Sequence, residues 1–310
     1  MMGPAPDARI ARMDDGSPPH VAAADPATIF AARAHRFREL ARDHALGDWL
    51  RFLGRLADAQ HAALRDLPSV PLPNPAAIEN AHRNRMPPAP AHRWRPKEIW
   101  RDVLHGIVAT LQTQAPPTVQ KSLALLAAMV PGQLDGLAQR VLHREPPAQD
   151  RDLLPFVAAA LQVTWTATAA RLAGIGLVHA LDVPGVCPCC GSLPVASVVR
   201  GAGEVANVRY LHCSLCETEW NLARIKCAAC ASSGRIAYHY LAGEGQPEVP
   251  AVRAESCDEC GSYLKILYRD KAPRADAVAD DLATLALDVL LDEAGYARAG
   301  PNLLFVPGPG

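Results

Sequence analysis

The feature that most constrains this chain is the spacing of its cysteines. All nine cysteines of the 310 residues lie between Cys187 and Cys260, and eight of them form four C-x-x-C pairs. Two thiolates three residues apart on a tight turn can face one ion, and a second such turn completes a tetrahedral four-sulfur site. The pattern therefore predicts two four-cysteine metal sites.

The lengths of the intervening segments indicate how the pairs combine. The first two pairs are separated by 22 residues (191–212) and the last two by 26 (231–256), but only ten (217–226) separate the second pair from the third. The longer segments leave room for a two-stranded excursion and return, so we expect the pairs to combine sequentially. The predicted ligands are Cys187, Cys190, Cys213 and Cys216 in the first site, and Cys227, Cys230, Cys257 and Cys260 in the second.

Four thiolates leave no open coordination position, which is typical of a structural metal site, whereas catalytic zinc keeps one position open. The spacing does not separate zinc from iron, because a tetrahedral four-sulfur cage accepts both. Iron would make the site a one-electron redox centre. The neighbouring residues do not supply a nucleophile, a base and an oxyanion site together, so we expect no catalytic residue and no enzyme.

Three features of the cysteine pairs need a separate interpretation. Gly191 and Gly261 each follow a pair and fit a tight turn whose N–H groups face sulfur. Cys189 lies between two predicted ligands, and we interpret it as a spectator whose side chain points outward; a redox-active or substitute-ligand thiol is the alternative. Trp220 is interpreted as a packing residue beside the metal.

Charge and hydropathy exclude several classes of function. The net charge is −1, and residues 185–272 carry nine Lys/Arg and nine Asp/Glu, which argues against a nucleic-acid-binding ribbon. The first 20 residues lack the apolar core of a signal peptide, and no apolar run approaches the length of a membrane span. We expect a cytoplasmic protein without membrane insertion, in which clustered cysteines favour metal over disulfides.

The chain is predicted to be an α+β protein in five parts. We expect a disordered leader (1–25), an all-α helical domain (26–184), a first four-cysteine rubredoxin-like module (185–222), a second such module (223–272), and a C-terminal helix and tail (273–310). Apolar periodicity predicts helices over Thr28–Leu67 with a possible break at Gly47, Lys97–Gln114, Pro117–Met129, Pro131–His143 and Arg151–Leu181. The last of these is apolar nearly all round, which favours the centre of a bundle. Because the helical half contains no cysteine, we expect it to fold without metal.

After Gly185 the sequence pattern changes from helical periodicity to short runs typical of β-strands. Strands are expected over Val195–Arg200, Asn207–His212, Arg235–Leu241 and Tyr263–Tyr268. Each four-cysteine module would then contain a hairpin, as in a zinc ribbon. The segment Asp276–Gly295 predicts an amphipathic helix. Asp280 and Asp281 near its start are interpreted as serving the N-terminal turns.

The motifs CPCCGSLPVASVV, RYLHCSLCETEWNLARIKCAAC and ESCDECGSYLKILYRDK, followed by VADDLATLALDVLLDEAGYARAGPN, resemble the FdhE family of formate dehydrogenase accessory proteins. The early helical segment ARAHRFRELARDHALGDWLRFLGRLADAQ carries the same resemblance. A generic zinc ribbon would not share the segments YLHCSLCETEW and VADDLA. The resemblance therefore extends over most of the chain beyond the leader.

The resemblance implies an accessory factor that matures respiratory formate dehydrogenase by binding its catalytic subunit in the cytoplasm. It implies rubredoxin-like domains in which the eight paired cysteines hold two metal ions, with iron favoured and zinc possible. Cys189 departs from the pattern expected of the family at the first pair. The alternatives are a rubredoxin-like electron carrier and a nucleic-acid-binding zinc ribbon, of which the neutral charge disfavours the second.

Overall fold

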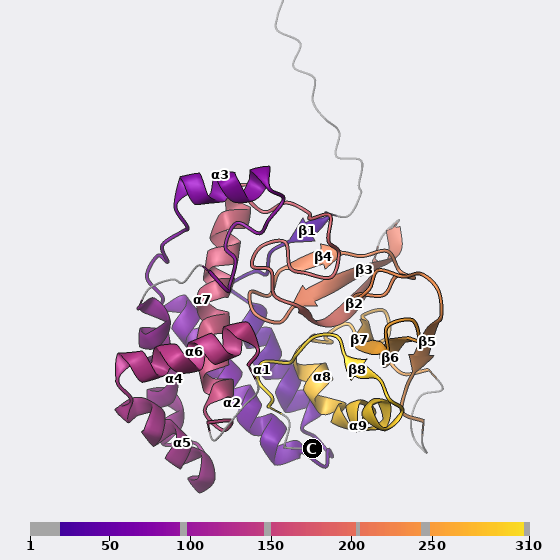
Figure 1. The fold of residues 1–310 in the computed structure, drawn as a ribbon. Helices are drawn as coiled ribbons and strands as arrows, with labels where there is room; N and C mark the ends of the chain where they lie inside the picture. Colours follow the sequence, from indigo (N-terminus) through magenta and orange to yellow (C-terminus); the bar gives the residue numbers. More distant parts are fainter. Residues whose placement is uncertain (1–18, 94–97, 146–149, 203–204, 243–248, 307–310) are drawn as a thin grey trace, which may run out of the picture.

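The computed structural model describes residues 19–93, 98–145, 150–202, 205–242 and 249–306. A group of helices from the first half of the chain packs beside one mixed eight-stranded sheet, and two short C-terminal helices lie next to the sheet (Figure 1). This arrangement confirms the predicted α+β class, with helices first, two cysteine modules next and helix at the end. No helix among these residues is long and apolar enough to cross a membrane.

The helical half contains seven helices within the described ranges. They are α1 (Ile29–Leu40), α2 (Gly47–Arg65), α3 (Pro75–Arg83), α4 (Ile99–Gln112), α5 (Pro117–Ala128), α6 (Pro131–His143) and α7 (Leu154–Gly174). Proline at the first position of α3, α5 and α6 suits a helix start, because its missing N–H would have no partner there. Helix α3 has no counterpart among the sequence-based expectations; Asn74 caps it by accepting a hydrogen bond from the Ala76 N–H.

Helix α7 occupies the centre of the bundle, as expected from its apolar sequence, and packs against α2, α4 and α6 (Figure 1). It ends at Gly174, earlier than predicted. Gly176 has a φ of +72°, and the Leu177 N–H turns back to donate to the Leu172 carbonyl. A left-handed glycine with such a backward bond is a common helix stop, so the chain leaves the helix before Leu181.

The two cysteine modules share a single sheet. Its strands are β1 (Val21–Ala22), β2 (Pro194–Ala202), β3 (Val205–Cys213), β4 (Glu219–Asn221), β5 (Ile236–His239), β6 (Val252–Cys257), β7 (Ser262–Tyr268) and β8 (Ala297–Arg298). The order is β1-β4-β3-β2-β7-β6-β5, with β8 paired to β7. Strands β2 and β7 pair in parallel, with Ser197 opposite Ile266, so the sheet is continuous across both modules. The four predicted strands lie within β2, β3, β5 and β7 or overlap them.

The end of the predicted leader is structured. Residues 1–18 of the expected disordered segment (1–25) lie outside the described residues, but Val21 and Ala22 form β1 and pair with Trp220 and Glu219 of β4. The Tyr210 hydroxyl also donates to the Pro19 carbonyl. Expecting disorder up to residue 25 was therefore wrong, because β1 supplies the hydrogen-bond partners for the outer edge of β4.

The predicted helix Asp276–Gly295 is divided into α8 (Ala279–Ala283) and α9 (Leu285–Glu293). At the break, Thr284 has φ −118° and ψ 34°, and its hydroxyl donates to the Asp280 carbonyl. The Lys265 ammonium donates to the carbonyls of Asp281 and Thr284. In a continuous helix these backbone carbonyls would accept hydrogen bonds from N–H groups of the helix itself. Because the Thr284 hydroxyl and the Lys265 ammonium donate to them instead, the helix can be interrupted at Thr284.

Candidate metal centres

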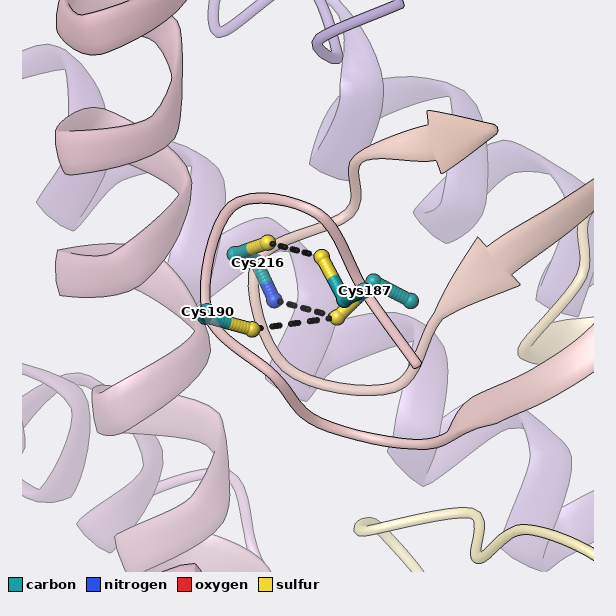
Figure 2. Close-up of side chains that lie close together, drawn as sticks. Cys187, Cys190 and Cys216 are labelled. Atoms are coloured by element: carbon teal, nitrogen blue, oxygen red, sulfur yellow. Dashed lines mark hydrogen bonds between the residues drawn. The ribbon is translucent and has the colours of Figure 1, made fainter. Parts of the chain in front are cut away.

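The first cluster brings together Cys187, Cys190, Cys213 and Cys216 from two facing turns, one before β2 and one after β3 (Figure 2). The Sγ atoms of Cys187 and Cys216 are 3.4 Å apart, and those of Cys190 and Cys213 are 3.5 Å apart. All four sulfur atoms lie within 4.8 Å of one another, and all four side chains are buried. The structure thus places these cysteines in the sequential pairing predicted from their spacing.

The second cluster brings together Cys227, Cys230, Cys257 and Cys260 in the same way. Its sulfur atoms are 3.7 Å apart between Cys227 and Cys260 and 3.8 Å apart between Cys230 and Cys257. Cys227 and Cys257 are buried, whereas Cys230 and Cys260 are exposed. The two clusters therefore have the same connectivity but different access to solvent.

The four turns share one backbone feature. Each pair is followed by a residue with positive φ: Gly191 (+76°), Glu217 (+60°), Ala231 (+63°) and Gly261 (+65°). In the first turn the Gly191 N–H donates to the Cys187 carbonyl, and in the last the Gly261 N–H donates to the Cys257 carbonyl. The glycines predicted to form tight turns do so, but Glu217 and Ala231 adopt the same left-handed conformation at a cost in strain.

The donor set suits a divalent metal ion. The sulfur pairs that face each other are 3.4 and 3.5 Å apart in the first cluster and 3.7 and 3.8 Å apart in the second, too far for disulfides, whose S–S length is about 2 Å. In the first cluster, burial raises the pKa of the Cys187 thiol well above its usual value, and the adjacent Cys190 thiol raises it further. Four thiolates in this buried cluster would need a cation to balance their charge, and tetrahedral four-sulfur geometry admits zinc or iron.

Cys189 does not point outward. Its side chain is only 1% exposed, and the Cys216 thiol beside it, together with burial, raises the pKa of Cys189 well above the usual value. Its carbonyl accepts a hydrogen bond from the Ala89 N–H of the segment before α4, which holds the turn against the helical half. The interpretation as an outward-facing spectator was wrong, because this half covers the turn; a fifth thiol lies against the first cluster.

Trp220 packs in the same hydrophobic core as Cys187, and its indole Nε1–H donates to the Pro184 carbonyl at 2.6 Å. Its predicted packing role is confirmed. The two histidines of this region have polar partners other than the paired cysteines. His212 lies between the carboxylates of Glu217 and Glu219, and the His239 ring contacts the Ser256 hydroxyl at 2.8 Å.

A buried ion network joins the first cluster to the helical half. Arg33 of α1 donates from Nη1 and Nη2 to the two carboxylate oxygens of Glu217 at 3.0 and 2.6 Å, and from Nε to Asp276 at 3.0 Å. Glu217 directly follows Cys216 and also contacts His212 Nε2 at 2.6 Å. The sequence analysis assigned no role to Arg33, although a signal was present: it lies on α1 between Phe30 and Phe37, within the buried stripe.

Asp280 and Asp281 belong to this charged interior. Asp280 accepts a hydrogen bond from the Asp276 N–H, as expected of a residue that serves an N-terminal turn. Both carboxylates are nevertheless buried and paired with cations: Asp280 with Arg36 of α1, and Asp281 with Lys265 and Arg298. The interpretation as simple helix-start residues was therefore incomplete, because adjacent positions point in different directions and reach different cations.

Three family descriptions together match nearly all of the described residues. The family descriptions "FdhE, N-terminal", "FdhE, central domain" and "FdhE, C-terminal domain" match residues 18–181, 186–224 and 225–305. The chain belongs to the FdhE family. The resemblance carried by the cysteine motifs is thereby confirmed.

Named members of the FdhE family are similar along nearly their full length. A protein FdhE homolog from Edwardsiella ictaluri is 42% identical over 280 residues, which is 90% of this chain and 89% of the relative. Protein FdhE from Escherichia coli is 37% identical over 282 residues, 91% of this chain and 89% of the relative. The crystal structure of the FdhE protein from Pseudomonas aeruginosa superposes with a TM-score of 0.84 at 37% identity, covering 94% of this chain and 100% of that one.

Proposed function

We propose that this chain is an accessory factor for the maturation of respiratory formate dehydrogenase, and that it acts in the cytoplasm by binding the catalytic subunit of that enzyme. The observation that carries the proposal is the match to the FdhE family along the helical half and both cysteine modules. The proposal assigns no catalytic residue to the chain. It includes no membrane insertion and no nucleic-acid partner.

We further propose that the eight paired cysteines are metal ligands. Cys187, Cys190, Cys213 and Cys216 would hold one ion, and the second cluster (Cys227, Cys230, Cys257 and Cys260) would hold another. The family resemblance favours iron, which supplies one-electron redox chemistry in a four-sulfur site, whereas zinc supplies a cross-link alone. In either case the chain's cysteines hold the two modules (185–222 and 223–272) in shape between the helical domain (26–184) and the C-terminal segment (273–310).

The proposal is tested in a bacterial strain that produces respiratory formate dehydrogenase and lacks its own FdhE. The full chain should restore formate dehydrogenase activity and should co-purify with the catalytic subunit from the soluble fraction. A matched strain that produces the enzyme's catalytic subunit without this chain gives the background. Failure to restore activity, with the chain present at normal level and folded, would contradict the accessory role.

A further inference from the structure

The two cysteine clusters differ in how they are enclosed. In the first cluster all four cysteines are buried, whereas in the second the thiols of Cys230 and Cys260 are exposed. Both exposed residues are the second cysteine of their pair, and their partners Cys227 and Cys257 are buried. The second cluster thus has a protected side and an open side.

The helical half encloses the first cluster. The Ala89 and Ala91 N–H groups donate to the carbonyls of Cys189 and Cys190 at 3.1 and 2.9 Å. From the other side, Gln162 of α7 donates to the Ser214 carbonyl at 2.9 Å, and Figure 2 shows α7 running beside the cluster. Both turns of the first cluster are therefore pinned by hydrogen bonds to elements outside the module.

The turns of the second cluster are bonded within their own module and to the C-terminal segment: the Ala297 N–H donates to the Gly261 carbonyl, and the Tyr296 hydroxyl donates to the Asp258 carboxylate. The Cys227 N–H donates to the Ser232 carbonyl, and the Ala231 N–H returns to the Cys227 carbonyl. The neighbouring strand β5 ends the sheet on the side away from α7 (Figure 1). Next to the cluster, Asp258 and Glu259 are exposed, and so is the Ile225 side chain. The open side of this cluster therefore faces solvent.

We propose that the second cluster is the exchangeable metal site of this chain, and that soft ligands such as thiolates reach its ion through the edge formed by Cys230 and Cys260. The inference rests on the proposed assignment of the eight cysteines as ligands. An incoming thiolate takes the position of Cys230 or Cys260, whose sulfur leaves and accepts a proton. No electron is transferred, and the number of sulfur ligands stays at four.

The physical reason for the difference is access. An exposed thiolate can be approached by an incoming ligand and can be protonated by water as it leaves. In the first cluster, an arriving ligand must first open the contacts with α7 and with the segment around Ala89, and an unpaired charged sulfur in that interior is costly. The first cluster should therefore keep its ion under conditions in which the second exchanges.

The test uses the full chain loaded with Zn²⁺ under anaerobic conditions, after its zinc content has been measured. Release to the chromogenic chelator 4-(2-pyridylazo)resorcinol at neutral pH should be biphasic, with one ion per chain leaving at least about ten-fold faster than the other, because buried regions open more rarely than exposed ones. Two ions released at a single rate overturn the inference. A chain that binds fewer than two ions contradicts the ligand assignment as well.

Two further measurements assign the fast phase. The double variant Cys230→Ser with Cys260→Ser should lose the fast ion and keep the slow one, and the matched double variant Cys190→Ser with Cys216→Ser alters the equivalent positions of the first cluster. Because the matched variant removes buried ligands and can misfold, zinc-loaded wild-type chain is also treated with iodoacetamide and mapped by mass spectrometry. Alkylation should reach Cys230 and Cys260 first. Equal labelling of both clusters, or a fast phase that survives in the Cys230/Cys260 variant, refutes the inference.

Discussion

The buried guanidinium of Arg33 gives the sharpest test of how the helices are attached to the first cysteine module. Replacing Arg33 by alanine removes three charge-assisted hydrogen bonds, two to Glu217 and one to Asp276. The Arg33 and Glu217 side chains are 0% exposed, and that of Asp276 is 10% exposed. The variant therefore removes the guanidinium from two buried carboxylates, of which Glu217 keeps its contact with His212.

Removing one partner of a buried ion pair typically costs about 3–5 kcal/mol. We expect the variant Arg33→Ala to lose about this much of the free energy of unfolding at pH 7. Arg38 on the same helix is a matched control, because it also makes a 2.6 Å ion pair, with Asp58, but both side chains are half exposed (50% and 51%). The variant Arg38→Ala should lose about 0.2–1 kcal/mol. Burial, and not distance, is what distinguishes the two pairs.

The measurement is urea denaturation of the metal-loaded chain, followed by circular dichroism at 222 nm. A third variant, Arg33→Met, keeps much of the side-chain volume and should remain nearly as destabilised as Arg33→Ala. If Arg33→Ala unfolds within about 1 kcal/mol of the wild type, or no more easily than Arg38→Ala, the reasoning from buried charge is refuted. Recovery of wild-type stability in Arg33→Met would assign the loss to packing.

The loss of stability in Arg33→Ala should depend on pH, and the direction of that dependence follows from the pKa of Asp276. Burial acts to raise the pKa of Asp276, but the Arg33 charge outweighs it and holds the pKa below its usual value. In the wild type, this carboxylate therefore stabilises the fold above its unfolded pKa of about 3.9, and the contribution is lost as the pH falls through the folded value. Without Arg33 the largest opposing charge is lost, so the folded pKa of Asp276 rises, although the Ala279 N–H and His212 still act to lower it. The stability deficit of Arg33→Ala should then shrink as the pH is lowered from neutral toward the unfolded pKa of about 3.9.

Three further expectations concern metal and domain structure. The double variant Cys187→Ser with Cys190→Ser should keep one of two ions by elemental analysis, and loss of both with the fold intact would show that the sites are interleaved. A chain that ends at Val183 should lack a cooperative thermal transition, because Arg33 loses both carboxylates; a sharp, chelator-insensitive transition would instead show an independent helical half. Zinc-loaded and iron-loaded chains should be compared in a formate dehydrogenase maturation assay. Restored formate dehydrogenase activity with the iron-loaded chain alone would favour redox participation, whereas equal activity with both metals would leave a metal-stabilised binding module. Formate oxidation by the purified chain would contradict the accessory role.

The cysteine clusters could be anticipated from sequence because four C-x-x-C pairs leave few ways to build tetrahedral sites. The segment lengths then selected the sequential combination that the structure shows. The main helices and strands followed from apolar periodicity, since each buries one face or is buried all round. These features depend on local spacing, which a single sequence displays directly.

The buried charges could not be anticipated in the same way. Arg33, Asp280 and Asp281 belong to residue types that usually lie on the surface, and their partners are far away in sequence: Arg33 contacts Glu217, and Asp280 contacts Arg36. The parallel pairing of β2 with β7 also depends on distant segments. Because each module was expected to form its own hairpin, nothing in the local pattern indicated that the two hairpins join into one sheet.

The surroundings of the helical half also depend on distant segments. Its lack of cysteines predicts a part that folds without metal, which stays a prediction, and its core continues into the first cluster and includes both Leu161 and Cys187. Gln162 extends this contact by donating to the Ser214 carbonyl. Apolar stripes show which face of a helix is buried, but they do not show what covers that face.

The parallel pairing of β2 with β7 affects how the chain can fold during its synthesis. A ribosome releases Ser197 long before Ile266, its neighbour in the register, so the centre of the sheet cannot close until most of the chain has emerged. Asp276, which balances Arg33 of the first long helix, emerges later still. During translation, α1 therefore carries an interior cation without its full set of counter-ions. Nascent chains of this protein should depend on general chaperones until their last 40 or so residues are made.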